Sequence, residues 1–273
     1  MTDSFDGPPL TPPPERASFP DGLRFAFGTL TVLPARITRW DRPAARTGMA
    51  CAPLAGLVVG VLAAVPGVLL LVLGGGPLLA AAVTVAVPAA LTRGLHLDGL
   101  ADTADGLGSA KPADEALRIM KQSDIGPFGV VTLVIAMLVQ VAALSDVYAD
   151  SWIRGALAAV VAAVTARLAM TLACREGVPA ARPGGLGAAV AGVVPRAVAA
   201  AIAVLVVAAA AAAALPLGLP AAGRQAAAVL VALLAAQLLL RRCVRRFDGV
   251  TGDVFGALAE VAATTALIVL ALG

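Results

Sequence analysis

Residues 54–73 read LAGLVVGVLAAVPGVLLLVL, an unbroken apolar run of 20 residues with no charged side chain. A helix rises about 1.5 Å per residue, so about 20 such residues cross the ~30 Å hydrocarbon core of a bilayer. A surface helix of a soluble domain would carry polar residues along one face. The run therefore predicts a membrane-spanning helix.

The composition of the whole chain agrees with this prediction. Of its 273 residues, 60% are hydrophobic and 14% are charged, whereas soluble domains average about 45–50% and about 25%. So few charges cannot cover a soluble globule of this size. Three cysteines are too few for a disulfide scaffold, and a net charge of +3 suits basic cytoplasmic loops. We expect a membrane protein that binds no nucleic acid.

Seven apolar segments are long enough, or nearly long enough, to cross the membrane. They are 54–73, 77–92, 128–147, 153–173, 197–217, 225–240 and 254–272. The second and sixth are short, so we expect them to be tilted or extended by flanking residues. Segment 23–33 is shorter still, which favours an interfacial or re-entrant helix. The pattern predicts an all-α polytopic membrane bundle of about seven transmembrane helices.

Basic residues alternate between the connections and predict the orientation. Arginine and lysine cluster before the first span and after the second, fourth and sixth, while the other connections carry almost none. By the positive-inside rule, the N-terminus lies in the cytoplasm and the C-terminus lies outside. Residues 1–22 are rich in proline and acid and have no apolar signal-peptide core, so we expect a flexible cytoplasmic tail. Residues 23–273 then form a single membrane-embedded domain.

The connection from Arg93 to Pro127 holds six of the seventeen carboxylates of the chain. Asp98, Asp102 and Asp105 follow one another at i, i+4 and i+7, so they share one face of a helix. Three like charges on one face are explained if they hold a divalent cation such as Mg²⁺ or Mn²⁺, and Mg²⁺ favours substrate phosphates as further ligands. The alternative is a solvated acidic face. The glycine and alanines between the acids favour a closely approaching phosphate.

The same connection holds further candidates for substrate contact. His96, the only histidine, lies roughly opposite the three aspartates on a regular helix, so it is either outside the helix or not a fourth ligand. We expect a short amphipathic helix from Pro112 to near Ser123. On it, Lys121 could face phosphate or contact lipid head groups. Asp124, Gly126 and Gly129 lie at the entrance of the third span.

A second polar cluster lies between the sixth and seventh spans. Asp253 and Glu260 are seven residues apart, hence on one helix face, and Glu260 lies inside the predicted last span. A carboxylate within the membrane indicates a functional site. Backbone N–H groups and the Thr251 hydroxyl could bind phosphate or sugar oxygens. Arg167 is a candidate partner for Glu260, unless its side chain extends to the interface. Together the clusters predict a membrane enzyme with a cytoplasmic, metal-dependent site.

Two runs in and next to the connection from Arg93 to Pro127 resemble the cobalamin synthase family, the adenosylcobinamide-GDP ribazoletransferases. They are RGLHLDGLADTADGL at 93–107 and IMKQSDIGPFG at 119–129. Weaker matches are FGTLTVLP at 27–34, the start of the first span at 53–60, and TGDVFGALAE at 251–260. The resemblance extends from about Phe25 over nearly the whole chain. Gln122 departs from the family, in which an aspartate is common there.

The resemblance implies an integral enzyme of the bacterial cytoplasmic membrane that uses Mg²⁺. It would join α-ribazole, or its 5′-phosphate, to adenosylcobinamide-GDP and release GMP. Asp98, Asp102 and Asp105 would then bind Mg²⁺, and one of them or Asp124 would act as the base. Arg93 and Lys121 would steady phosphate charge. The other implied substrate contacts are His96, Gly126, Gly129, Thr251, Asp253 and Glu260.

Other protein classes share parts of this pattern. Asp102-Thr-Ala-Asp105-Gly106 resembles the start of the CDP-alcohol phosphotransferase motif, but the later half with two more aspartates is missing. Membrane prenyltransferases normally carry two Asp-rich motifs with asparagine, and this chain has no asparagine. A transporter would spread its charges through the spans around a midplane site, whereas these acids cluster at one face.

Overall fold

The computed structural model describes residues 16–272, so most of the predicted 1–22 tail lies outside the described residues. The helices are α1 (Phe19–Leu30), α2 (Arg42–Val72), α3 (Pro77–Leu91), α4 (Leu95–Gly108), α5 (Ala113–Ile119), α6 (Pro127–Asp150), α7 (Trp152–Ala173), α8 (Gly185–Val190), α9 (Arg196–Ala214), the 3₁₀ turn η1 (Leu215–Leu217), α10 (Leu219–Phe247) and α11 (Gly252–Ala271). Within residues 16–272, the strand-like backbone pairing consists of two isolated β-bridges. The all-α prediction is confirmed.

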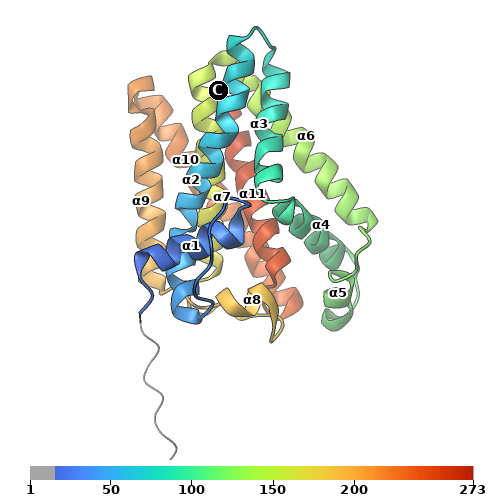
Figure 1. The fold of residues 1–273 in the computed structure, drawn as a ribbon. Coiled ribbons are helices and arrows are strands. Elements are labelled where there is room, and N and C mark those ends of the chain that lie inside the picture. Colours follow the sequence, from blue (N-terminus) through green and yellow to red (C-terminus); the bar gives the residue numbers. More distant parts are fainter. Residues whose placement is uncertain (1–15, 273) are drawn as a thin grey trace, which may run out of the picture.

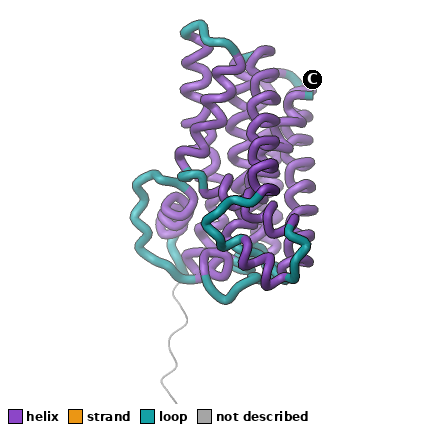
Figure 2. The backbone as a smooth tube through the Cα atoms, turned by 90° about the vertical axis from the view of Figure 1, so that its right-hand side faces the viewer, coloured by secondary structure: helices purple, strands orange, loops and turns teal. Residues whose placement is uncertain are grey.

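Six of these helices are long and apolar enough to cross a membrane, namely α2, α6, α7, α9, α10 and α11. The seventh candidate is the pair α3 and α4, which is bent by 87°. The described chain begins at one end of the bundle and ends at the other (Figure 1). The longer connections gather at the end where it begins, which we call the loop-rich end (Figure 2).

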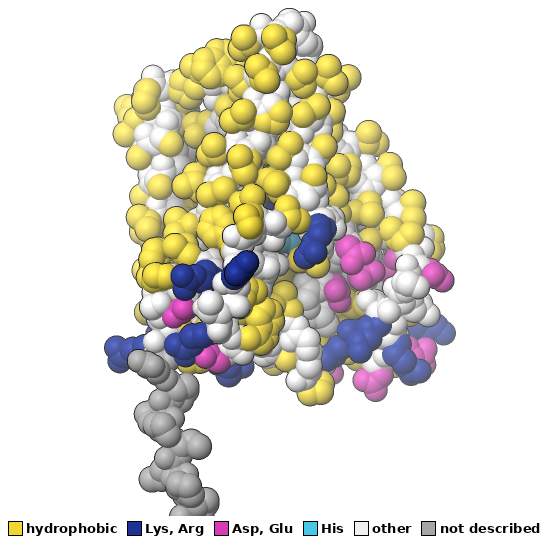
Figure 3. Space-filling model, in the orientation of Figure 1, with side chains coloured by type: hydrophobic (Ala, Val, Ile, Leu, Met, Phe, Trp, Pro, Cys, Tyr) yellow, Lys and Arg dark blue, Asp and Glu magenta, His cyan; other side chains and the backbone are white. Residues whose placement is uncertain are grey.

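Charged side chains follow the same division. On the face drawn in Figure 3, the upper part is almost wholly hydrophobic, and the arginines, lysines and acids lie toward the loop-rich end. Large apolar side chains such as Val65, Leu138 and Val204 are more than half exposed on this bundle. In a bilayer such side chains face lipid, which is why they need no protein partner.

Several helices extend beyond the apolar segments from which they were predicted. Helix α2 begins at Arg42 rather than at 54, and α10 continues through four arginines to Phe247 rather than ending at 240. Arginine is a good helix former, so a charge ends the apolar run without ending the helix. At about 1.5 Å per residue, the 29 residues of α10 measure about 43 Å. This length exceeds the hydrocarbon core, so one end lies in the head-group region.

Small residues let α2 and α7 pack backbone against backbone. A Cβ added at Gly56 would lie 2.5 Å from the carbonyl oxygen of Ala163, and one at Gly60 would lie 2.7 Å from the Cα of Val160. Glycines four residues apart form one small-residue face, the usual interface between membrane helices. The apolar stretch at 53–60 thus has a packing role in the bundle.

Helix α1 lies across α2 at the loop-rich end (Figure 1). Its Phe25 is 1% exposed, and a Cβ at Gly48 of α2 would collide with the Phe25 ring at 2.4 Å. Twelve residues are too short to span a bilayer. The helix begins at Phe19, after an N-cap at Ser18, so residues 19–22 are helical and the predicted tail extended too far.

The bend between α3 and α4 brings the acidic helix out of the bundle axis. Arg93 and Gly94 both have positive φ, 54° and 71°, and their N–H groups bond to the carbonyls of Ala90 and Ala89. These two bonds form a Schellman ending of α3, in which glycine usually occupies the position that Arg93 takes. The second predicted span is therefore short because it ends at this motif, and α4 starts directly after it.

Candidate active site

The site is built where α4 packs on the first turns of α11. A Cβ at Gly99 would lie 2.6 Å from the carbonyl oxygen of Asp253, and one at Gly256 would lie 3.0 Å from the Cα of His96. The glycine among the acids of α4 is thus required by helix packing. For Gly99, this gives a packing reason in place of the interpretation that a small residue there admits a phosphate. The contact also sets the acids of the two motifs side by side.

Asp98, Asp102 and Asp253 form an acidic cluster across this contact. Burial, followed by the negative charges of Asp98, Asp253 and Asp105, raises the pKa of Asp102 to about 7, while Arg182 opposes the rise. Asp98 is exposed and Asp102 is half-buried. The two acidic motifs that are far apart in the sequence therefore share one electrostatic site.

Asp105 has a different environment from its two predicted partners. It is buried, and its carboxylate oxygens accept the backbone N–H groups of Gly126 at 2.8 Å and Gly129 at 2.9 Å. A Cβ at either glycine would collide with this carboxylate. Asp105 therefore caps the N-terminus of α6, where a negative charge is favoured by the helix dipole. Gly126 and Gly129 admit Asp105, which is a structural reason for both glycines.

The remaining acids are the candidates for a metal. Within residues 16–272, no three acidic, histidine or cysteine side chains already stand in a metal-binding arrangement. Mg²⁺ is commonly held by one or two carboxylates, with substrate phosphates and water as the other ligands. Asp98 and Asp102, with Asp253 beside them, are hard oxygen donors crowded by like charge. This donor set fits such a cation once a phosphate is bound.

A cavity of about 660 Å³ opens beside the acidic cluster. His96, Lys121, Arg182, Thr251 and Asp253 line it, together with the glycine-rich stretch 184–187. The Thr251 hydroxyl accepts the N–H of Val254 and lies 3.1 Å from an Asp253 carboxylate oxygen, so it caps α11 and holds Asp253. The cavity therefore combines two cations, a carboxylate and several exposed backbone groups.

Arg182 is a lining residue that the sequence analysis missed. The preceding residues are tied to the turn before α11, because Ala181 donates its N–H to the Val250 carbonyl at 3.0 Å and Val250 donates to Pro179 at 2.9 Å. The Arg182 guanidinium also bonds to the carbonyl of Leu117 before α5 ends. An arginine followed by a proline and two glycines, in RPGGLG at 182–187, was the available signal.

His96 lies in the first turn of α4, so the helix does not begin after it. It is 2% exposed, and its Nε2 atom has no hydrogen-bond partner among the described residues. Burial, with the charge of Arg167, holds its pKa well below the usual range. The imidazole is thus neutral. It lines the cavity on a side of α4 that differs from that of the aspartates.

Some predicted residues lie apart from the cavity wall. Arg93 is exposed at the bend after α3, and Asp124 is exposed in the connection before α6. Asp124 accepts a long hydrogen bond of 3.4 Å from its neighbour Ser123. Helix α5 ends at Ile119 rather than near Ser123, which leaves Lys121 in the following turn, where it reaches the cavity.

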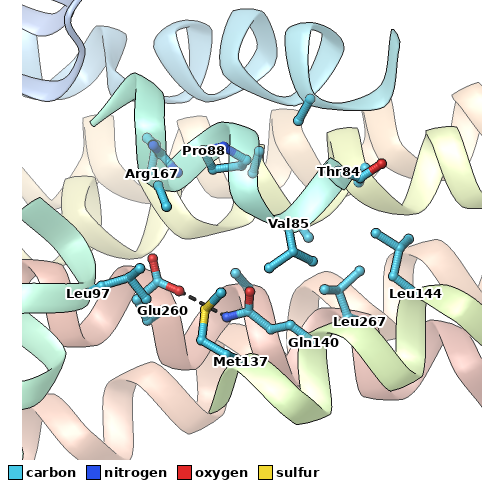
Figure 4. Close-up of a pocket in the computed structure, with 16 residues that line it drawn as sticks. Thr84, Val85, Pro88, Leu97, Met137, Gln140, Leu144, Arg167, Glu260 and Leu267 are labelled. Atoms are coloured by element: carbon cyan, nitrogen blue, oxygen red, sulfur yellow. Dashed lines mark hydrogen bonds between the residues drawn. The ribbon is translucent and has the colours of Figure 1, made fainter. Parts of the chain in front are cut away.

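Glu260 lies deeper, in a separate interior cavity of about 50 Å³ (Figure 4). Its carboxylate accepts the Gln140 side-chain amide at 2.9 Å, and the same amide lies 2.9 Å from the Thr264 hydroxyl. Arg167 lines this cavity too, but no ion pair within 4.0 Å joins it to Glu260 in the described chain. The shared helix face of Asp253 and Glu260 therefore serves two different cavities.

Comparison with known proteins gives one consistent family. The sequence profile of the family described as cobalamin-5-phosphate synthase matches residues 22–271. The chain is 45% identical over 267 residues to an adenosylcobinamide-GDP ribazoletransferase of Frankia casuarinae, covering 91% of this chain and 94% of that one. It is 39% identical over 255 residues to a protein of the same name from a Nocardioides species, covering 91% and 97%. No solved structure matches.

Proposed function

The chain belongs to the cobalamin-5-phosphate synthase family, and from that premise we propose its reaction and its site. The enzyme transfers the adenosylcobinamide-phosphate group of adenosylcobinamide-GDP to α-ribazole or its 5′-phosphate. GMP leaves, and adenosylcobalamin or its 5′-phosphate forms. The cavity between α4, α11 and the 182–187 stretch is where we place this chemistry. The observation that carries the proposal is that Asp253 lines this cavity and that its charge also acts on Asp102 of α4, which does not itself line the cavity.

The diphosphate of the donor is the group that this cavity suits best. Lys121 and Arg182 bring two positive charges to its wall, and an arginine guanidinium can bind a phosphate through two parallel hydrogen bonds. The glycines at 184–187 leave backbone N–H groups without covering side chains, which suits close contact with phosphate oxygens. We propose that Arg182 and Lys121 orient the diphosphate for in-line attack.

Mg²⁺ is the proposed cofactor, with Asp98 and Asp102 as its protein ligands and Asp253 beside them. When bound, Mg²⁺ would neutralise the negative charge that builds on the leaving phosphate. Asp105 is left out of the ligand set because both of its oxygens cap α6. The attacking group is a ribose hydroxyl of the acceptor, and the base that takes its proton is one of the cluster carboxylates.

We place the site on the cytoplasmic face of the bacterial cytoplasmic membrane. Support comes from the loop-rich end, toward which the arginines and lysines gather on the face drawn in Figure 3. GDP-activated donors are cytoplasmic metabolites, so the nucleotide can reach this end without crossing the membrane. The apolar surface of the bundle suits substrates and products that stay near the lipid.

A direct assay tests the proposal. Membranes containing the protein, adenosylcobinamide-GDP, α-ribazole and Mg²⁺ are expected to release GMP, and removal of Mg²⁺ is expected to stop release. Asp102→Asn removes one charged oxygen from the cluster and should reduce GMP release at least a hundredfold while insertion into the membrane is unchanged. Asp114→Asn is the matched control, because Asp114 is an exposed acid on α5 outside the cluster. Release of CMP from a CDP-alcohol without GMP release would contradict the assignment.

A further inference from the structure

A second basic cavity lies between α7 and α10, away from the cavity assigned to the diphosphate. It measures about 550 Å³ and is bordered by Arg175, Arg241 and Arg245. Between these cations its walls are apolar, formed chiefly by Leu172, Leu240 and Val244. It shares no lining residue with the cavity of His96 and Arg182. A ligand of this cavity would therefore bind apart from the site that we assign to the reaction.

The arginines of this cavity have no anionic partner in the described part of the chain. Arg175 bonds to the Leu172 carbonyl and, at 2.8 Å, to the side-chain oxygen of Gln237, both of which are uncharged. No carboxylate oxygen lies within 4.0 Å of Arg175, Arg241 or Arg245. Burial and the like charges of Arg196 and Arg241 lower the pKa of Arg175. Such crowding of like charge is relieved by a bound anion.

The depth of the cavity distinguishes a lipid from a dissolved anion. Helix α10 is about 43 Å long, and the stretch from Leu219 to Leu240 already accounts for about 33 Å. That stretch fills the ~30 Å hydrocarbon core, so Arg241 and Arg245 lie at head-group level. The apolar residues Leu240 and Val244 alternate with them along the same face. A lipid phosphate with its acyl chains beside it matches this alternation of charged and apolar side chains.

We propose that this cavity binds the phosphate of an anionic phospholipid, with Arg175, Arg241 and Arg245 around the head group and the acyl chains against Leu172, Leu240 and Val244. Basic pockets between membrane helices at the cytoplasmic interface are suited to anionic head groups. The bound lipid bridges the end of α7 to α10 and offsets the repulsion among the arginines. The inference is independent of the reaction, because it uses neither the acidic cluster nor the diphosphate cavity.

The test uses the full-length protein in a neutral detergent. Dioleoylphosphatidylglycerol is added, and lipid binding is followed by native mass spectrometry together with the thermal unfolding midpoint. We expect one or more retained anionic lipids and a rise in Tm of roughly 3–6 °C. Dioleoylphosphatidylcholine, which has the same acyl chains and no net charge, should give neither result. Equal binding and stabilisation by phosphatidylcholine would overturn the proposal.

Two variants locate the site on the molecule. Each arginine near an anionic surface contributes about fivefold to affinity, so Arg241→Gln with Arg245→Gln should weaken phosphatidylglycerol binding roughly 25-fold. Arg242→Gln is the matched control, since Arg242 is an exposed arginine on the same turn that does not line the cavity. Unchanged binding in the double variant, or an equal loss in the control, would contradict the assignment.

A third experiment distinguishes a bound lipid from free phosphate, and it uses only the wild-type protein. Inorganic phosphate is added to the wild-type protein at the concentration at which phosphatidylglycerol saturates the shift in Tm. We expect no comparable shift, because phosphate alone lacks the acyl chains that fill the apolar walls. An equal shift with inorganic phosphate would replace the lipid by a soluble anion and so overturn the proposal.

Discussion

Outside the spans, Asp102 is the carboxyl group whose pKa is raised furthest from its ordinary value. Its pKa is raised from 3.8 to about 7, chiefly by burial and then by Asp98 and Asp253. Below pH 7 the carboxyl is mostly protonated, and above pH 7 it is mostly ionised. A metal ligand or base must be ionised, so GMP release should fall as the pH drops through about 7.

The competition between proton and cation gives this prediction a second readout. Because Mg²⁺ and the proton compete for the same oxygen, raising the Mg²⁺ concentration should move the acid limb of the rate profile to lower pH. The measurement is initial GMP release between pH 5.5 and 8.5 at two Mg²⁺ concentrations. A flat profile, or an acid limb that Mg²⁺ does not move, would remove Asp102 from the metal site.

Asp105 should act on stability through its cap of α6. Asp105→Ala removes the acceptor of two backbone N–H groups, those of Gly126 and Gly129, and each buried N–H left unbonded costs about 1–3 kcal/mol. We expect the variant to lose roughly 2–4 kcal/mol of unfolding free energy, measured by thermal unfolding in detergent. Asp102→Asn is the control, since it removes a crowded charge and should not lower Tm. Equal stability of the two variants would favour a ligand role for Asp105.

Two residues of the site, Asp105 and Arg182, have roles that could not be predicted from the sequence. The i, i+4, i+7 spacing of Asp98, Asp102 and Asp105 predicted one acidic face, and α4 contains all three. Spacing could not show that the oxygens of Asp105 are taken by N–H groups more than twenty residues later. Nor could it show that Arg182 reaches the cavity, because a chain connection outside any helix places it there.

At the scale of elements, the packing of α4 on α11 sets the distance between the two acidic motifs. Gly99→Ala would place a Cβ 2.6 Å from the Asp253 carbonyl oxygen, so the helices must move apart. We expect a loss of about 1–3 kcal/mol in stability and at least a tenfold loss in GMP release. Both are measured on the purified variant, by thermal unfolding and by the GMP assay.

Gly223 provides the control for this substitution. It also lies within a helix, α10, but a Cβ there would meet nothing within 4 Å. Gly223→Ala should leave GMP release unchanged and raise stability by up to about 1 kcal/mol, because alanine favours the helix. If Gly99→Ala behaved like Gly223→Ala, the close contact of α4 with α11 would not position the site.

Element boundaries were predicted less well than the elements themselves. Apolar runs located every long helix, because a bilayer requires about 20 apolar residues at each crossing. The same rule placed the start of α2 too late and the end of α10 too early, since arginines continue both helices outside the hydrocarbon. The 87° bend after α3 depends on two residues with positive φ, one of them Arg93, for which the sequence gives little warning.

At the scale of the whole molecule, the bundle keeps its polar chemistry at one end. The described chain starts at the loop-rich end and finishes at the opposite end, as an odd number of crossings requires (Figure 1). The positive-inside rule assigns the loop-rich end to the cytoplasm. The same assignment puts the cavity proposed for the diphosphate, and Arg241 and Arg245 of α10, on the cytoplasmic side. One measurement of orientation therefore tests the placement of both cavities.

Cysteine labelling can measure that orientation with little background. Cys51, Cys174 and Cys243 are free and buried. Gly76→Cys, before α3, introduces a thiol where a Cβ meets nothing within 4 Å. Asp114→Cys introduces one at an exposed position of α5, at the loop-rich end. A membrane-impermeant maleimide added to intact spheroplasts should label Gly76→Cys and not Asp114→Cys, and permeabilisation should make Asp114→Cys reactive. The reverse pattern would place the site, and its nucleotide substrate, on the wrong side of the membrane.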